Sequence, residues 1–257
     1  MTKETKSPLK FSPLRVAGQS LGDQMVDNAF DSIAGPYMVA VLLGVMAATE
    51  WLRWYVKSPP APWLYTAIAV AGGLWAFWMM RRGMAQASRL RQGRDGERAV
   101  AQYLEWFRTK DFFVFHDVPT GDANIDHVLI GTRGVYAIET KTLSKPARGA
   151  CTVTVVDGVL RANGMPLDRD PIVQAKAEAR WLYNFLAEAQ FKQFVQPVVV
   201  FPGWFVEKHD RKALGVWVLE PKALDAFIES QPVVLPHAQV RAMSSALSSY
   251  IRSQSRL

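Results

Sequence analysis

Two acids and a lysine are the residues of this chain whose types and spacing could do chemistry. Asp126 lies in the string Asn124-Ile-Asp-His127, and after twelve further residues the chain reads Glu139-Thr-Lys141. Two carboxylates at neighbouring strand ends can bind a hard divalent cation such as Mg²⁺ through their oxygens. An adjacent ammonium can hold an attacking water or balance the charge that develops on a phosphate. The alternative is an ordinary solvent-facing pair at Glu139 and Lys141, with Asp126 as a surface acid near a turn.

A predicted β-hairpin would bring these residues together. Residues 124–130 and 135–142 read as strands, and Gly131-Thr-Arg-Gly134 between them reads as a tight turn. Because side chains alternate along a strand, Val135, Ala137, Glu139 and Lys141 should share one face. The hairpin returns the preceding strand alongside, so Asp126 can come within reach of Glu139.

The surrounding pattern predicts an α/β domain over residues 93–257. A helix is expected first, over residues 93–109, because Val100, Tyr103, Leu104 and Phe107 recur at helical spacing. Asp170-Pro171 should open a long helix that runs to about Gln190. The other expected elements are strands at 112–118, 151–156, 159–161, 196–201 and 216–220 and helices at 223–230 and 237–252. This order is typical of a sandwich built on a mixed sheet.

Two apolar stretches predict a transmembrane helical hairpin over residues 36–80. Residues 61–80 hold no ionisable side chain except Tyr65, and at about 1.5 Å per residue they span the ~30 Å hydrocarbon core. Residues 36–56 are nearly as apolar but carry Glu50 and Arg53, one turn apart, which can pair near the interface. A pair of buried core helices is the alternative, although helices that are apolar all round rarely suit a domain this small.

The arginines that follow the second stretch predict its orientation. Five of the basic residues that make up the net charge of +7 lie in the segment Arg81 to Arg94, whereas the turn between the stretches has only Lys57. The positive-inside rule then places the basic linker 81–92, the domain after it and the polar segment 1–35 in the cytoplasm. The same arginines are expected to bind anionic lipid headgroups, with a DNA-binding role as a secondary reading. Ala40, Gly44 and Ala48 form a row of small residues on one helix face, which favours tight packing of the two helices of the hairpin. The alternative is that this row forms the interface of a homodimer.

Four sequence blocks together resemble the NERD (nuclease-related domain) family of the PD-(D/E)xK superfamily. They are Gly96-Glu97-Arg-Ala-Val100, Asn124-Ile-Asp-His127, Gly134-Val-Tyr-Ala-Ile-Glu-Thr-Lys141 and Asp170-Pro-Ile-Val-Gln174-Ala175. The blocks occur in the family's order over roughly residues 93–200. The chain departs from the superfamily pattern in having no proline before Asp126.

The resemblance implies a restriction-endonuclease-like fold and hydrolysis of phosphodiester bonds with Mg²⁺ or Mn²⁺. By this carry-over Asp126 and Glu139 are metal ligands, Glu97 is a further acid facing the metal, and Lys141 orients water. Gln174 would contact the site or the substrate backbone. The alternatives are that Glu97 is a helix N-terminal acid favoured by the helix dipole and that Gln174 is an exposed helix residue.

We therefore expect a nuclease anchored in the cytoplasmic membrane by two helices, with DNA favoured over RNA as its substrate. The rival is a catalytically silent module, tethered in the same way, that binds nucleic acid or docks a protein. Other chemistries find little support: the lone Cys151 excludes a disulfide framework or a Cys-based zinc site within one chain. The chain also has no Walker loop and no Gly-x-Ser-x-Gly elbow. Two spans with one peripheral ion pair offer no path for a transported solute.

Overall fold

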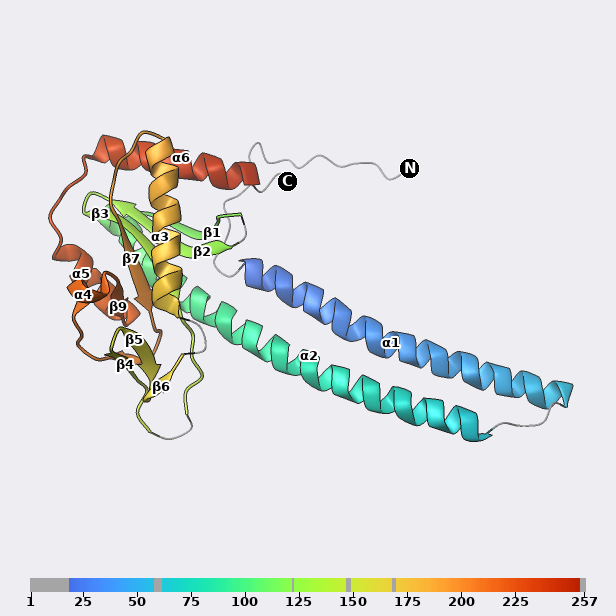
Figure 1. Ribbon diagram of the computed structural model, residues 1–257. Helices are drawn as coiled ribbons and strands as arrows, with labels where there is room; N and C mark the ends of the chain where they lie inside the picture. Colours follow the sequence, from blue (N-terminus) through green and yellow to red (C-terminus); the bar gives the residue numbers. More distant parts are fainter. Residues whose placement is uncertain (1–18, 58–61, 122, 147–148, 168–169, 255–257) are drawn as a thin grey trace, which may run out of the picture. The chain divides into compact units, whose positions relative to one another are not determined.

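The computed structural model describes residues 19–57, 62–121, 123–146, 149–167 and 170–254 (Figure 1). The chain divides into two compact units, one of residues 20–92 and one of residues 93–257 with the first nineteen residues. Residues 1–18 and 58–61 lie outside the described ones. The predictions of a polar N-terminal segment and of the turn between the apolar stretches therefore fall partly outside them.

Two long helices make up the first unit. Helix α1 spans Gln19–Val56, and α2 spans Pro62–Leu104 and continues into the second unit. The two helices pass close to each other: a Cβ added at Gly35 would lie within 4 Å of Trp75 and Met79, and one added at Gly72 within 4 Å of Val39. Because the later residue of α1 meets the earlier residue of α2, the apolar segments run antiparallel.

Among the described residues, one stretch is long and apolar enough to cross a membrane. It is Gly35–Val56, with 22 residues and a mean hydropathy of 1.4, and none of it is buried within the chain. In α2 the apolar stretch is the shorter Thr66–Met79. Exposed aromatic side chains on α1 include Trp51, Trp54 and Tyr55. The first predicted span therefore passes by length and composition, whereas a second full span over 61–80 stays a prediction.

A five-stranded mixed sheet forms the centre of the second unit. Its order is β1 (Phe113–Pro119), β2 (Asn124–Gly131), β3 (Gly134–Thr140), β7 (Val195–Val200) and β9 (Trp217–Leu219). Strands β1, β2 and β3 pair antiparallel, whereas β7 and β9 run parallel to β3. The predicted α/β class with a mixed sheet is confirmed.

Helices cover both faces of this sheet. Helix α3 (Pro171–Glu188) packs on β3 and β7, and α6 (His237–Gln254) packs on β1 and β2 (Figure 1). The end of α2, the 3₁₀ helix η1 (Glu105–Lys110) and α5 (Leu224–Glu229) supply the core of the opposite face. Every residue of β3 is buried because elements cover both faces of this strand. A strand covered on both faces reads as a nearly continuous apolar run, as residues 135–138 do.

A smaller sheet stands beside the main one. It has the order β6 (Met165–Pro166), β5 (Val159–Ala162), β4 (Thr152–Val156) and β8 (Phe205–Val206). The predicted hairpin at Asp157-Gly158 is confirmed, and both turn residues have positive φ. Helix α4 (Arg211–Leu214) and the 3₁₀ helix η2 (Pro221–Ala223) complete the connections.

The boundaries differ from the prediction in three places. The basic segment 81–92 is helical and forms part of α2. The helix expected to reach residue 109 ends at Leu104 and tightens into η1, where Asp111 with a φ of 61° turns the chain into β1. Strand β3 ends at Thr140, so Lys141 lies just beyond it, although the Lys141 N–H still donates to the Val200 carbonyl at 2.9 Å.

Candidate active site

The hairpin of β2 and β3 places Asp126 beside Glu139. His127 pairs with Ile138, so the next step along the ladder brings these two acids opposite each other. The Thr140 N–H donates to Asp126 Oδ2 at 2.7 Å, and the carboxyl groups of Asp126 and Glu139 are close enough to affect each other's pKa. The sequence pattern predicted this approach from the hairpin alone.

A third acid, Glu178, reaches the same place from helix α3. Asp170 caps this helix by accepting the Ile172 N–H at 2.9 Å, and Pro171 occupies its first turn. The Glu178 carboxyl lies close enough to Glu139 to raise its pKa, and Glu178 Oε1 accepts from Gln174 Nε2 at 3.0 Å. Glu139 is 5% exposed and Glu178 is 6% exposed. Three carboxyl groups therefore meet in one largely buried site.

Burial is the largest cause of a raised pKa at each of the three acids. Burial, and then repulsion by Asp126 and Glu178, raises the pKa of Glu139 well above its ordinary value. Burial and the charge of Asp126 raise the pKa of Glu178 to about 8. Burial raises the pKa of Asp126 to about 6, against the opposing hydrogen bonds from Thr140 and Glu139. The site therefore favours the protonated forms of Glu139 and Glu178 more strongly than water does, and that of Asp126 to a smaller degree.

Lys141 and Glu97 lie at the end of β3. The positive charge of Lys141 acts on both Asp126 and Glu139 and lowers the pKa of each. Gly96 lies directly against Thr142, so that a Cβ at position 96 would come within 2.9 Å of three Thr142 side-chain atoms. Glu97 follows Gly96 in α2 and is 8% exposed. The close approach of α2 to the residues after β3 therefore requires glycine at position 96. It also brings the turn of α2 that carries the buried Glu97 next to Thr142.

Two oxygens at this site are buried without a hydrogen bond in the part of the chain that the structure describes, Glu139 Oε2 and Glu178 Oε2. Buried polar atoms normally find partners, so such exceptions need an explanation. Among the described residues, no three His, Cys, Asp or Glu side chains stand in an arrangement that could hold a metal ion as it is. Any cation would therefore rely on one or two of these carboxylates together with water or substrate oxygens.

A histidine pair that the sequence did not predict lies on the other face of the sheet. His116 and His127 face each other across β1 and β2, with 2.9 Å between their Nδ1 atoms. His116 Nε2 lies 3.1 Å from Glu105 Oε1 on η1, which packs on the face opposite α3. Burial lowers the pKa of both rings. This pair is therefore separate from the three carboxyl groups.

The structure gathers the residues that the sequence singled out. Asp126, Glu139 and Lys141 come together, and Gln174 joins them through Glu178. Glu97 reaches the same end of β3, in the turn of α2 that packs on Thr142. Sequence reasoning missed Glu178, although it is a charged residue on the apolar face of α3 that also carries Ala175 and Leu182.

Comparison with known families supports a nuclease-related assignment for this part of the chain. A family model described as the nuclease-related domain, NERD, matches residues 92–202. The matched segment contains the three carboxyl groups, Lys141, Glu97 and Gln174. The predicted resemblance to this family is thus confirmed over that segment. No curated protein and no solved structure matches the chain.

Proposed function

We propose that this chain is a membrane-anchored, metal-dependent nuclease that hydrolyses phosphodiester bonds, with DNA as the favoured substrate and the fold of the PD-(D/E)xK superfamily. The observation that carries the proposal is the meeting of Asp126, Glu139 and Glu178 inside the segment that matches the nuclease-related family. Acids held this close, two of them buried, destabilise a fold unless protons or a cation neutralise them.

The donor set fits Mg²⁺ or Mn²⁺. All the candidate ligands are carboxylate oxygens, which hard divalent cations prefer. Mg²⁺ is commonly held by one or two carboxylates plus water and substrate phosphate, so Asp126 and Glu139 are sufficient, with Glu178 or Glu97 as a further acid. Glu139 Oε2 and Glu178 Oε2 have no hydrogen bond to any described residue, and a bound cation would give them an atom to coordinate. When bound, the cation would polarise a phosphate oxygen and make water easier to ionise.

The remaining side chains would act on water and on the substrate. The Lys141 ammonium, whose charge already acts on Asp126 and Glu139, would orient the attacking water and balance charge on the phosphate. Gln174 would hold the Glu178 carboxyl in place through its 3.0 Å hydrogen bond and could contact the substrate backbone. Glu178 or Glu139, once deprotonated, is placed to take a proton from that water.

Helix α1, and the shorter apolar stretch of α2 beside it, would anchor the chain in the membrane as a hairpin. Pairing between Glu50 and Arg53, 3.7 Å apart, lowers the cost of placing both in an apolar helix. Arg81 and Arg82 lie over the rings of Phe77 and Trp78 at 5.8 and 3.7 Å. Such arginine–aromatic pairs are typical of the membrane interface, where they also meet anionic headgroups.

The positive-inside rule places the nuclease domain and the N-terminus in the cytoplasm. Labelling can test this orientation because Cys151 is the chain's only cysteine. In a Cys151→Ser background, a cysteine placed at Lys57 should react with a membrane-impermeant maleimide added to intact cells. A label that reaches position 57 only after the cells are opened would contradict this orientation.

Calorimetry and plasmid cleavage test the nuclease proposal directly. The full chain in detergent would be titrated with Mg²⁺ and Mn²⁺ and assayed in the same preparations. Asp126→Asn and Glu139→Gln should each lose both cation binding and cleavage. Glu188→Gln, an exposed acid at the end of the same helix as Glu178, should keep both.

The outcomes separate the two functional readings. Loss of binding and cleavage together in both site variants, with normal behaviour of the control, would establish a metal-dependent nuclease. A folded wild-type chain that binds neither cation and leaves every nucleic acid intact would instead identify a silent docking or binding module.

A further inference from the structure

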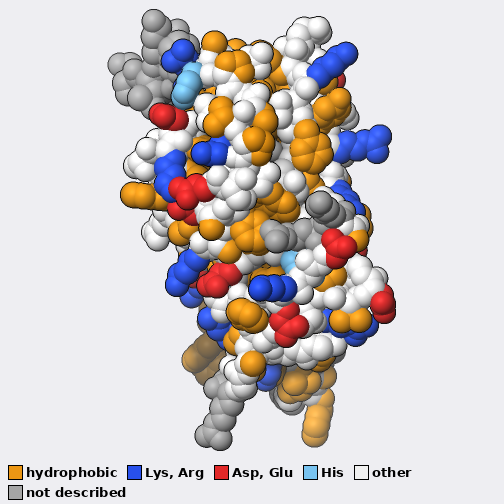
Figure 2. Space-filling model, turned by 90° about the vertical axis from the view of Figure 1, so that its left-hand side faces the viewer, with side chains coloured by type: hydrophobic (Ala, Val, Ile, Leu, Met, Phe, Trp, Pro, Cys, Tyr) orange, Lys and Arg blue, Asp and Glu red, His pale blue; other side chains and the backbone are white. Residues whose placement is uncertain are grey.

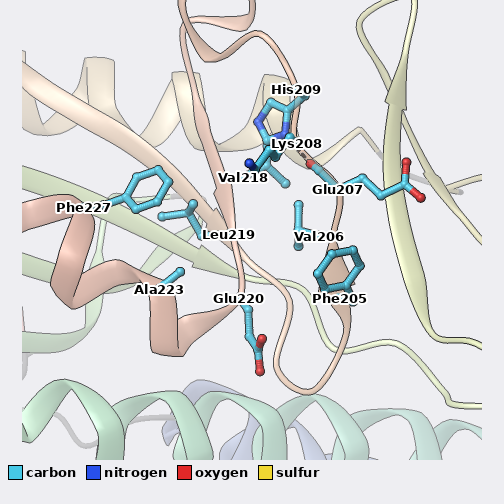
Figure 3. Close-up of a pocket in the computed structure, with 10 residues that line it drawn as sticks. All are labelled: Phe205, Val206, Glu207, Lys208, His209, Val218, Leu219, Glu220, Ala223 and Phe227. Carbon is cyan, nitrogen blue, oxygen red and sulfur yellow. Dashed lines mark hydrogen bonds between the residues drawn. The ribbon is translucent and has the colours of Figure 1, made fainter.

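A pocket of about 460 Å³ opens beside β9, the edge strand of the main sheet (Figure 3). Three parts of the chain line it. They are β8 with the residues after it, the end of β9, and the segment that leads into α5: Phe205, Val206, Glu207, Lys208, His209, Val218, Leu219, Glu220, Ala223 and Phe227. A pocket of this size lies within the range of small-ligand sites.

The sheet register connects this pocket to the three carboxyl groups. Glu139 pairs with Val199 of β7, and Val199 pairs with Val218 of β9, which lines the pocket. Parallel neighbours in register point to the same face. With strands about 4.8 Å apart, the backbone at Val218 lies about 10 Å from that at Glu139, roughly the rise of three stacked nucleotides. Glu139 of the candidate active site and Val218 of the pocket therefore lie at paired positions across the sheet, two strands apart.

We propose that this pocket binds one unpaired nucleotide of the strand that is cut, a few nucleotides from the scissile phosphate. The inference rests on the proposed nuclease function and adds a specificity site to it. The side chains of the pocket offer three things that a nucleotide needs. They are an aromatic ring on which the base can stack, a hydrogen-bond acceptor for the edge of the base, and a cation for the phosphate.

Phe205 supplies the ring face. It is 64% exposed although it lies in a strand, so an apolar ring is presented to solvent at the pocket. Across the pocket, Phe227 packs edge-on against Trp217 with ring centroids 5.5 Å apart, which gives that wall a fixed aromatic backing. Bases of a single strand commonly stack on exposed aromatic side chains of this kind.

His209 supplies an acceptor for the base edge. Its Nδ1 lies 3.0 Å from the Glu207 carbonyl oxygen, which can only accept, so Nδ1 carries the proton in the neutral ring. Nε2 is then an acceptor, and it is buried with no hydrogen bond to any described residue. Glu220 also lines the pocket, but its carboxylate points away from the other lining side chains in Figure 3. The acceptor at His209 favours a base with an exocyclic amine, namely cytosine, adenine or guanine, over thymine.

Lys208, exposed next to His209, supplies the cation for the nucleotide's phosphate. Glu207 points away from the other lining side chains in Figure 3, which reduces its repulsion of that phosphate. The face of the molecule in Figure 2 shows basic and acidic side chains interspersed among hydrophobic ones. Binding on such a surface requires specific contacts, since no broad basic field covers that face.

Oligonucleotide binding to the full chain in detergent tests the proposal. A Glu139→Gln background prevents turnover, and a short fluorescent oligo-dC is compared with oligo-dT at one fixed salt concentration. Phe205→Ala should weaken oligo-dC binding by about 10-fold. The matched control Phe194→Ala removes an equally exposed ring, 66% exposed, at the opposite end of the strands and should change binding less than 2-fold. His209→Phe should abolish the preference for oligo-dC.

The outcomes distinguish the pocket from the nuclease activity. Equal binding by Phe205→Ala and Phe194→Ala, or no preference for oligo-dC in the parent, would overturn the pocket while leaving cleavage by the wild type intact. Binding that depends on Phe205 in a chain that cleaves nothing would support the pocket and refute the nuclease activity. If Phe205→Ala unfolds, Phe205→Leu and photocrosslinking from 5-iodo-deoxycytidine decide: crosslinks should fall in residues 205–209, and crosslinks elsewhere would overturn the proposal.

Discussion

Replacing Glu178 by glutamine should make the protein more stable at high pH while reducing its activity. Glutamine keeps the shape of the side chain and can still accept the hydrogen bond from Gln174. It removes one of the negative charges that raise the pKa of Glu139. The substitution therefore isolates the electrostatic cost of the third acid from its packing.

The magnitude follows from the pKa of Glu178, which rises from an ordinary 4.5 to about 8 on folding. A raised acid pKa means that the folded state binds the proton more tightly than the unfolded state. The stability that this gives is present at low pH and is lost as pH rises from about 4.5 through about 8. Each unit corresponds to about 1.4 kcal/mol, so the wild type should lose on the order of 5 kcal/mol over this window of about 3.5 units. For a unit of this size that is about 10 °C in Tm.

Thermal unfolding of the full chain in detergent, at several pH values and with EDTA to remove divalent cations, would measure this effect. The Tm difference between Glu178→Gln and wild type should be small at pH 5 and grow to about 10 °C at pH 8.5. The control Glu188→Gln should show no such growth. A Tm difference that is independent of pH, or that shrinks as pH rises, would refute the idea that buried acids repel one another here.

Three further predictions concern the same unit. Cleavage should rise with pH from about 6 to about 9, because protons on the site's raised-pKa carboxyl groups compete with the cation; activity that falls over this range would contradict the proposal. Gly96→Ala should destabilise the protein by about 1–3 kcal/mol and lower activity, since its Cβ would meet Thr142 closer than 3 Å, whereas Gly73→Ala, with open space around it, should be neutral in thermal unfolding. Phe107→Ala should cost about 3–5 kcal/mol by denaturant unfolding because the ring is fully buried, whereas Trp106→Ala, at 54% exposure, should cost far less.

Local patterns in the sequence predicted much of the fold. The alternation of apolar residues and the two glycines of the turn Gly131–Gly134 predicted β2 and β3 to within two residues at each end. The Asp170-Pro171 pair predicted the start of α3, and its capping hydrogen bond is present. The hairpin also predicted that Asp126 and Glu139 approach each other. In each case the determinants lie within a few residues of one another in the chain.

Features that depend on distant parts of the chain were not predicted. Strand β8 is two residues long and joins the small sheet only by pairing with β4, which lies about fifty residues earlier. The contact between His116 and His127 depends on the exact register of β1 on β2. Glu178 was missed because its partners are on β3, although a charge on the buried face of an amphipathic helix was a usable signal.

The electrostatics of the site argue for catalysis over docking. A module that only bound a partner could carry glutamine at 139 and 178 and be more stable for it, because replacing buried charges with neutral groups commonly stabilises a fold. This chain instead brings three carboxyl groups together, and buried Glu139 and Glu178 each keep an oxygen with no hydrogen bond to any described residue. Such an arrangement is unfavourable without protons or a cation and becomes favourable when a divalent cation binds. Perturbed acids of this kind cluster at functional sites, where the stability that they cost is offset by ligand binding.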